Sequence, residues 1–421
     1  MLARMIRYGF ACKTIGVPGA DQTTLTLAKA DRENLLRVSR HNLHALGVML
    51  RYCRGEGIRL MRISSDIIPL ASHPDVAFDW QTALQQELED IASLLARTGV
   101  RVSMHPGQYT ILNSPRDDVV ARAVADLHFH AAFLDAVDAD RTARIILHLG
   151  GGYGDKPAAL KKLARNLETL PEHIRNRLAL ENDERIYTIE DVLTICDEFS
   201  LPAIFDVYHH SINPPTLGTM PDWLDKAALT WGEANGRQKI HYSQQWPGGK
   251  PGMHSRSIGM DAFLGFHDVL ENRELDVMLE VKDKNLSAVK CANLTPPALP
   301  QRKLADEWAR YKYLVLEHDP VAYTEIRALL KQEKPAATDF YGCLEQALQK
   351  AVTPGHARNA AHHVWGYVDK PASDTERKRV LADIEALDRD PKALPRLKHK
   401  LLALAEKQEQ EYLLRSLYLY L

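Results

Sequence analysis

The 421-residue sequence is poor in cysteine and in net charge, and it lacks long apolar runs. Its five cysteines are widely spaced and form no C-x-x-C pair, which argues against a disulfide scaffold and for a reducing compartment. No apolar run reaches the roughly 18 residues of a membrane span, and residues 1–9 contain no signal-peptide core. A net charge of -2 excludes nucleic-acid binding by bulk charge alone. We therefore expect a cytoplasmic protein without a membrane partner.

Short β-rich runs alternate with helix-like stretches as far as about residue 290. The intervening segments, such as Asp31–Leu50 and Trp80–Arg97, have the spacing of amphipathic helices. Strands that alternate with helices pair in parallel, and eight such units favour a TIM (β/α)8 barrel over a doubly wound open sheet. The eight runs are Ile6–Phe10, Ile58–Ile63, Val100–Met104, Arg144–His148, Leu178–Glu181, Ala203–Asp206, Lys239–Tyr242 and Asp276–Glu280.

The pattern changes after Leu294, where several prolines interrupt the chain. From residue 301 onward only helical spacing remains. This segment holds 20 Lys or Arg against 18 Asp or Glu, so it is not a basic tail. We therefore predict a barrel domain over residues 1–294 and a C-terminal helical extension over residues 301–421, to which the sequence assigns no role.

Most of the predicted strands end in a side chain of a type that binds metal ions. The active sites of such barrels form at the C-terminal ends of the strands, so these side chains should converge on one mouth. A single histidine is more often a structural residue than a ligand, but independent structural roles do not explain why so many strands end alike. The candidate ligands are His73, His105, His148, Glu181, Asp206, His209, His241, His254 and Glu280.

The carboxylates of Glu181, Asp206 and Glu280 should repel one another at this mouth unless a cation or an arginine compensates them. We expect a cation, because histidines end these strands and arginines do not. Nitrogen and oxygen donors without a thiolate suit Mn²⁺ or Zn²⁺, whereas Mg²⁺ prefers oxygen shells. The nine candidates exceed the needs of one four- to six-coordinate ion, so we predict two or three divalent ions and a catalytic role for the three carboxylates.

Nine short motifs follow one another across about residues 5–290. They are Arg7-Tyr-Gly-Phe10, Arg62-Ile-Ser-Ser-Asp66, His105-Pro-Gly-Gln-Tyr109, Leu112-Asn-Ser-Pro115, His148-Leu-Gly-Gly151, Leu180-Glu-Asn-Asp183, Asp206-Val-Tyr-His-His210, Lys239-Ile-His-Tyr-Ser243 and Glu280-Val-Lys-Asp-Lys284. In composition and order they resemble the UV damage endonuclease family. The resemblance implies a TIM barrel with up to three metal ions, usually manganese, held by the nine candidate ligands.

The resemblance also implies a reaction on UV-damaged double-stranded DNA. The enzyme would hydrolyse the phosphodiester bond immediately 5′ to a cyclobutane pyrimidine dimer or 6-4 photoproduct, and often at abasic sites. The products would be a 3′-hydroxyl and a 5′-phosphate, which initiate excision repair.

Five residues are expected to contact the DNA. Gln108 and Tyr109 follow His105 in a Pro-Gly turn, where they could enter the duplex and fill the gap left by two fused pyrimidines. Phe10 and Thr14 stand where the family commonly has a tyrosine and an asparagine facing the lesion. Lys282 lies beside a barrel-top loop and is a candidate phosphate contact.

Lys239 shares the inward face of its strand with the candidate ligand His241. An ammonium group beside divalent cations is disfavoured by like charge and by desolvation, which lower its pKa. A neutral amine can take up CO₂ as a carbamate, and the resemblance implies a modified lysine at this position. We therefore predict a catalytic, carboxylated Lys239; an unmodified lysine bonded to a carbonyl or carboxylate is the alternative.

Three other functions stay open on the sequence. A sugar isomerase of the same barrel superfamily needs fewer histidines and no side chain that enters DNA, so Gln108 and Tyr109 count against it. A general abasic-site endonuclease would be separated by comparing irradiated, abasic and undamaged DNA. A non-catalytic metal-binding protein, whose helical extension recruits a partner, would show no turnover with Mn²⁺.

Overall fold

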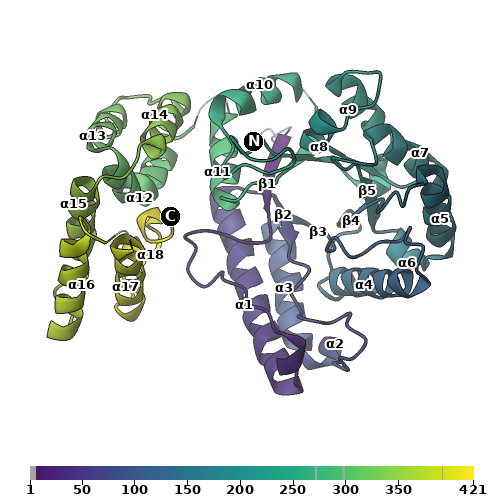
Figure 1. The fold of residues 1–421 in the computed structure, drawn as a ribbon, viewed down its shortest axis with the longest axis horizontal. Coiled ribbons are helices and arrows are strands. Elements are labelled where there is room, and N and C mark those ends of the chain that lie inside the picture. The colour runs from purple at the N-terminus through teal and green to yellow at the C-terminus, as the bar shows by residue number, and fades with distance from the viewer. Residues whose placement is uncertain (1–5, 271–272, 297–298, 391) are drawn as a thin grey trace. The chain divides into compact units, whose positions relative to one another are not determined.

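The computed structural model describes residues 6–270, 273–296, 299–390 and 392–421. The chain divides into two compact units (Figure 1). The first comprises the described residues up to 14 together with residues 19–258 and 265–292, and the second comprises residues 15–18, 259–264 and 293–421. Residues 1–5, which we included in the predicted barrel domain, lie outside the described residues.

The first unit contains a closed barrel of eight parallel strands in sequence order, with β8 pairing back onto β1. This finding confirms the TIM-barrel prediction and excludes the open sheet, which would leave two unpaired edges. The strands are β1 (Ile6–Ala11), β2 (Leu60–Ile63), β3 (Arg101–Met104), β4 (Arg144–His148), β5 (Leu178–Glu181), β6 (Ala203–Asp206), β7 (Gln238–Tyr242) and β8 (Leu275–Leu279).

Helices connect successive strands around the outside of the barrel (Figure 1). Local sequence fixes their starts: Asp31 caps α1 by accepting a hydrogen bond from the Asn34 backbone, and Thr188 and Asp191 form a capping box on α7. These helices are α1 (Arg32–Glu56), α2 (Trp80–Ala83), α3 (Gln85–Thr98), α4 (Asp117–Ala136), α5 (Lys156–Thr169), α6 (Glu172–Arg175), α7 (Ile189–Phe199), α8 (Val207–Ile212), α9 (Met220–Ala228), α10 (Met260–Leu270) and α11 (Asn285–Leu294).

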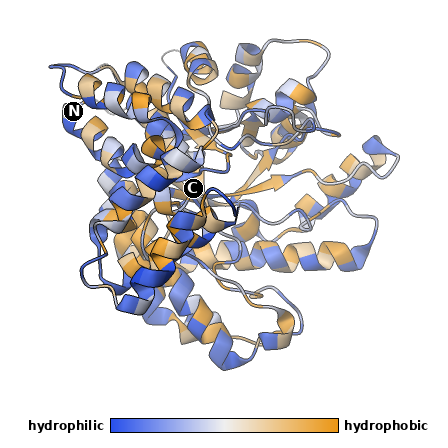
Figure 2. Ribbon diagram, turned by 60° about the vertical axis from the view of Figure 1, so that its left-hand side comes forward, coloured by the Kyte–Doolittle hydropathy of each residue, from blue (hydrophilic) through white to orange (hydrophobic). Residues whose placement is uncertain are grey.

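The barrel interior is layered because alternate residues of each strand point inward. Near the strand starts, Arg7 and Arg101 both pair with Asp276, at 2.5 and 2.8 Å. Further along, three inward positions form a buried apolar cluster of Ile146, Ala179 and Ile204. Figure 2 shows the largely hydrophobic colouring of the strands. The inward positions that come next carry the charged side chains of the barrel mouth.

The described elements of the second unit after residue 299 are all helices, joined by turns and loops. Its core includes Phe340, Val364 and Leu401, and it contains a partly buried ion pair of 2.7 Å between Glu317 and Lys398. Across the described residues of the whole chain, the helices are too short or too polar to cross a bilayer. The helices of this unit are α12 (Gln301–His318), α13 (Pro320–Leu329), α14 (Ala337–Gln349), α15 (Pro354–Trp365), α16 (Asp374–Ala386), α17 (Ala393–Lys407) and α18 (Glu411–Leu414).

Candidate metal centre

Glu181, the last residue of β5, lies at the centre of the barrel mouth and is 1% exposed. Its carboxylate meets His105 Nε2 at 2.9 Å, His148 Nε2 at 3.6 Å and His241 Nδ1 at 2.5 Å. Together with Asp206 these residues form two overlapping groups of possible ligand atoms, each within a 4.8 Å span, and Glu181 belongs to both. Strands on opposite sides of the barrel therefore deliver imidazoles and carboxylates to one point.

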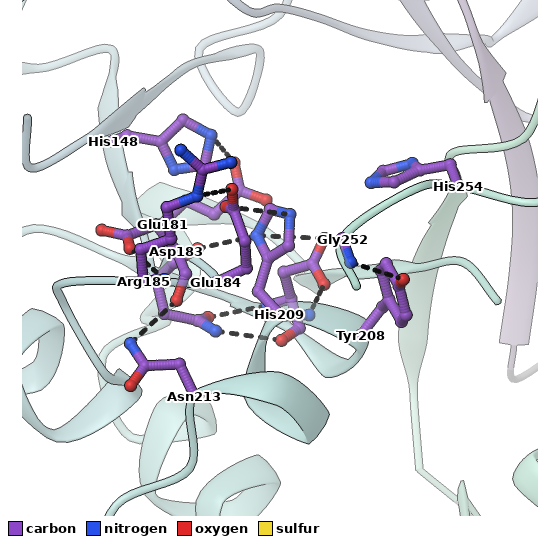
Figure 3. A network of polar contacts seen from close by, with 12 residues as sticks. His148, Glu181, Asp183, Glu184, Arg185, Tyr208, His209, Asn213, Gly252 and His254 are labelled. Atoms are coloured by element: carbon purple, nitrogen blue, oxygen red, sulfur yellow. Dashed lines mark hydrogen bonds and ion pairs between the residues drawn. The ribbon is translucent and has the colours of Figure 1, made fainter. Parts of the chain in front are cut away.

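Three further candidates continue this cluster. His209 lies on α8 with its ring centroid 5.8 Å from that of His148, and the His254 ring lies 6.0 Å beyond it (Figure 3). His254 Nδ1 is 3.9 Å from a carboxylate oxygen of Glu280, whose other oxygen is 3.2 Å from His241 Nδ1. Eight of the nine predicted ligands thus form one connected set.

The tautomers of three histidines suit metal binding. Nδ1 of His105, His209 and His254 lies 3.1, 3.0 and 2.6 Å from a backbone carbonyl oxygen. A carbonyl only accepts, so each Nδ1 carries a proton and Nε2 is the nitrogen left to bind metal. At His105 this Nε2 lies 2.9 Å from a Glu181 oxygen, so a metal ion would replace the proton between them. Backbone carbonyls fix metal-binding histidines in this way in many proteins.

Buried atoms without partners also fit a cation. Within the part of the chain that the structure describes, neither Asp206 Oδ2 nor His148 Nδ1 has a hydrogen-bond partner, although both atoms are buried. Such atoms are costly unless something else satisfies them. The donors are imidazole nitrogens and carboxylate oxygens, a mixture that suits Mn²⁺ or Zn²⁺. The residues therefore fit the implied divalent ions.

His73, the ninth predicted ligand, is placed differently. Its Nδ1 accepts a hydrogen bond of 3.2 Å from the Asp75 backbone, so in the neutral ring the proton resides on Nε2. Its ion-pair contact within the described residues is also with Asp75, at 4.0 Å. The structure thus does not bring His73 into the cluster, and the ring would have to change tautomer or charge state to bind metal through Nε2.

Arg62 corrects the expectation that no arginine compensates the carboxylates. This β2 residue is 8% exposed, its guanidinium forms an ion pair with Glu280, and its Nη2 lies 3.4 Å from His241 Nε2. The strand-end pattern missed it because Arg62 is the third residue of a four-residue strand. The signal was nevertheless available, because Arg62 lies inside one of the nine motifs.

The electrostatics of the centre favour the ionised forms of Glu181 and Glu280. Burial opposes ionisation of Glu181, but His241 and His148 outweigh it and hold the pKa of Glu181 well below its usual value. Burial likewise opposes ionisation of Glu280, and Arg62 and His241 outweigh it and lower the pKa.

The histidines of the centre respond in opposite directions. Burial lowers the pKa of His148, which favours the neutral ring that binds metal. His209 is also buried, but Asp206 and Glu181 more than offset that effect and raise its pKa to about 9. Metal binding at His209 must therefore displace a proton near neutral pH.

Lys239 is fully buried, and its Nζ has no hydrogen-bond partner among the described residues. Its Cα pairs in register with Asp276, one inward layer below His241. Burial, with help from the nearby guanidinium of Arg101, moves the pKa of the amine well below its ordinary value. The neutral form of the amine is therefore favoured.

The expected DNA-contacting residues differ in accessibility. Tyr109 is 81% exposed on the loop after β3, and Gln108 and Lys282 are exposed as well, whereas Thr14 is half-buried. Phe10 corrects a prediction, because its side chain is fully buried and alternates with the inward-facing Ala11. It packs on the outer face of the strand and contributes no surface to DNA.

Tyr208 is a further residue that the sequence did not single out. Its hydroxyl lies 2.5 Å from Gln245 Oε1. The same hydroxyl accepts a hydrogen bond of 3.2 Å from the Gly252 backbone (Figure 3). Its ring packs edge-on against His254 with centroids 5.4 Å apart. Tyr208 thereby ties the segment of residues 245–254 to α8.

Comparisons with known proteins find matches for both parts of the chain. The model of the family described as UV-endonuclease UvdE matches residues 6–296, and that of a family described as a protein of unknown function (DUF1722) matches residues 312–421. The relative from Clostridium perfringens, named UV DNA damage endonuclease, is 34% identical over 82% of this chain and 83% of its own length. A relative of the same name from Bacillus velezensis is 34% identical over 68% of this chain and 92% of its own.

A solved structure supports the same relationship. The crystal structure of SacUVDE is 36% identical, with a TM-score of 0.65 over 68% of this chain and 96% of that chain. The resemblance inferred from the nine motifs is confirmed, since the family match covers the entire barrel. The chain belongs to the UV-endonuclease UvdE family.

Proposed function

We propose that the barrel cleaves UV-damaged double-stranded DNA at the phosphodiester bond immediately 5′ to a cyclobutane pyrimidine dimer or 6-4 photoproduct. The products are a 3′-hydroxyl and a 5′-phosphate, abasic sites are also cut, and excision repair follows. The observation that carries the proposal is the connected set of imidazoles and carboxylates around Glu181 in a chain of this family. The proposed cleavage takes place in the cytoplasm.

Two or three divalent ions bind to this set of imidazoles and carboxylates. The expected ion is Mn²⁺, and Zn²⁺ or Mg²⁺ are the alternatives. When bound, they supply Lewis acidity, activating water and neutralising phosphate charge. Glu181, Asp206 and Glu280 supply the catalytic carboxylates, and Arg62 holds Glu280 in place. The ligand set comprises His73, His105, His148, Glu181, Asp206, His209, His241, His254 and Glu280, of which His73 binds through Nε2 only after its ring changes tautomer or charge state.

Lys239 acts in carboxylated form. Its neutral amine adds to the carbon of CO₂ and loses one proton, which leaves an anionic carbamate. The partnerless Nζ supports this proposal, as do Arg101, Arg62 and Arg144, whose positive charges act on the amine. Solution NMR with ¹³C-bicarbonate should detect a carbamate that is absent from Lys239→Met, and identical spectra would refute the modification.

On the DNA side, Gln108 and Tyr109 enter the duplex at the lesion, and Lys282 binds a backbone phosphate. The 81% exposure of Tyr109 supports this role, because its ring is free to stack on a base. Thr14 contacts DNA from the loop after β1. Phe10 is left out because it is buried.

Residues 1–294 form the catalytic domain, and residues 301–421 form a separate helical domain without an assigned role. One assay tests the proposed activity: purified protein is incubated with irradiated, abasic and undamaged plasmid, with Mn²⁺, Zn²⁺ or Mg²⁺ added singly. We expect nicking of irradiated DNA that depends on metal. Equal nicking of undamaged DNA, or nicking of abasic DNA alone, would contradict the lesion specificity, and an absence of nicking with every metal would contradict the enzyme.

A further inference from the structure

Tyr153 occupies a backbone position that disfavours its own side chain. It lies in the loop between β4 and α5, five residues after the candidate ligand His148. Residues 152–155 form a turn closed by a 2.9 Å hydrogen bond from the Asp155 backbone to the Gly152 carbonyl. Both central residues have positive φ, 48° at Tyr153 and 79° at Gly154. Glycine and asparagine suit such positions, whereas a bulky aromatic residue is rare there.

The loop beneath Tyr153 is built to hold the ring in place. The ring covers Gly151, where an added Cβ would lie 2.7 Å from the tyrosine Cζ. The Gly151 carbonyl accepts hydrogen bonds from Asn113 Nδ2 at 2.8 Å and from the Tyr187 hydroxyl at 2.9 Å, and the Gly151 amide donates to Asn113 Oδ1 at 3.1 Å. Asn113 and Tyr187 are both buried. The support is therefore rigid, while the tyrosine above it is 51% exposed.

The same asparagine links this loop to the one that bears Tyr109. Asn113 lies four residues after Tyr109 on the loop that follows β3, and its amide bridges to the loop that follows β4. Both loops leave the C-terminal ends of neighbouring strands, which is where the candidate metal centre lies. Two exposed tyrosines thus stand on joined loops at one rim of the barrel mouth.

A tyrosine at positive φ breaks the local backbone preference, and here it does so at an exposed position on a hydrogen-bonded loop beside a candidate active site. Such exceptions are expected where the side chain itself has a function. We infer that Tyr153 is a stacking platform for an unpaired nucleobase next to the lesion. The inference rests on the proposed function, and it assigns a second aromatic contact besides Tyr109. A base displaced from the stack needs a new stacking partner. The Tyr153 ring, which packs on Gly151 and is half exposed, provides one.

Two substitutions separate stacking from a structural role. Tyr153→Asn removes the ring and suits the positive φ, so the loop keeps its turn. Tyr153→Phe keeps the ring and is the matched control. Circular dichroism and thermal melting establish that both variants fold.

Binding is measured with two probes: a duplex containing one thymine dimer opposite 2-aminopurine, and a single strand containing the same 2-aminopurine. We expect Tyr153→Asn to bind the duplex about 5- to 150-fold more weakly, which corresponds to the 1–3 kcal/mol of one stacked base. It should also lose quenching of 2-aminopurine fluorescence, whereas Tyr153→Phe should behave as the native protein.

The outcomes distinguish this inference from the proposed function. If the native protein nicks irradiated DNA but Tyr153→Asn binds and quenches both probes normally, the platform is refuted and the function stands. A Tyr153→Asn variant that melts earlier but binds normally below its melting temperature refutes the platform in favour of a structural role. If the native protein does not nick irradiated DNA, the proposed function is refuted, and binding of the single-stranded probe then tests the platform. Equal affinity of the native protein and Tyr153→Asn for this probe refutes the platform, and weaker binding by Tyr153→Asn supports it.

Discussion

Glu181 is the residue whose replacement tests the metal centre most directly, because the test needs no turnover. Its carboxylate belongs to both groups of possible ligand atoms, and the side chain is 1% exposed. Glu181→Gln keeps the shape of the side chain and removes its charge. We therefore expect a folded protein that binds divalent ions much more weakly.

The magnitude follows from the linkage between binding and folding. A ligand that binds only the folded state stabilises it by RT ln(1 + [L]/Kd), about 2.7 kcal/mol when free Mn²⁺ is 100 times Kd. In a domain of about 290 residues, whose unfolding entropy is about 0.6 kcal/mol/K, that raises Tm by roughly 4 °C. Loss of a residue that hydrogen-bonds to a metal ligand weakens metal binding about 10- to 100-fold. Loss of a ligand itself, as in Glu181→Gln, should weaken binding at least as much. At 100-fold weaker binding the gain falls to about 0.4 kcal/mol, or roughly 0.7 °C.

Differential scanning calorimetry of chelator-treated protein, with and without Mn²⁺, measures this gain. Glu190→Gln is the matched control, because it makes the same chemical change at an exposed residue in the first turn of α7. The control should keep the native gain in Tm. A Glu181→Gln variant that keeps the native gain as well would refute the assignment of Glu181 as a shared ligand.

Four further predictions concern neighbouring residues. Arg62→Met should lower the free energy of unfolding of the metal-free protein by about 1–3 kcal/mol, because Glu280 loses its guanidinium partner and keeps only its histidine contacts. An unchanged urea midpoint would refute the pairing. Without metal, the raised pKa of His209 stabilises the folded protein fully below about pH 6.5, and this stabilisation is lost as the pH rises to about 9. The free energy of unfolding of His209→Gln, measured by urea denaturation, should lack this pH dependence. A pH dependence equal to that of the native protein would contradict the prediction. Tyr208→Phe keeps the ring that packs on His254 but loses the hydroxyl contacts. The affinity of one metal site should therefore fall about 10- to 100-fold in titration calorimetry. An equal loss of affinity at every metal site would contradict a local role of Tyr208. Tyr109→Ala should weaken binding to dimer-containing duplex about 5- to 150-fold in fluorescence anisotropy, with Tyr109→Phe as control, and equal loss on undamaged duplex would contradict a role at the lesion.

The barrel and most of the centre were predictable because their signals are local. A strand shows its two faces through alternation, and the residue at its C-terminal end must lie at the barrel mouth once the strands are parallel. The placement of His148, Glu181 and Asp206 therefore followed from the ends of three short runs. The motifs added the family, and through it the implied reaction.

Barrel closure decided what the sequence left open. Arg62 and Glu280 are 218 residues apart, and they meet only because β8 pairs with β1 beside β2. Phe10 shows the same dependence, because alternation separates two faces of a strand but pairing decides which of them is inside. The hydrogen bond that fixes the tautomer of His73 depends on the local path of its loop, and no residue spacing encodes that path. Sequence thus specified which chemical groups reach the mouth, whereas the three-dimensional pairing specified which of them neutralise, orient or bury one another.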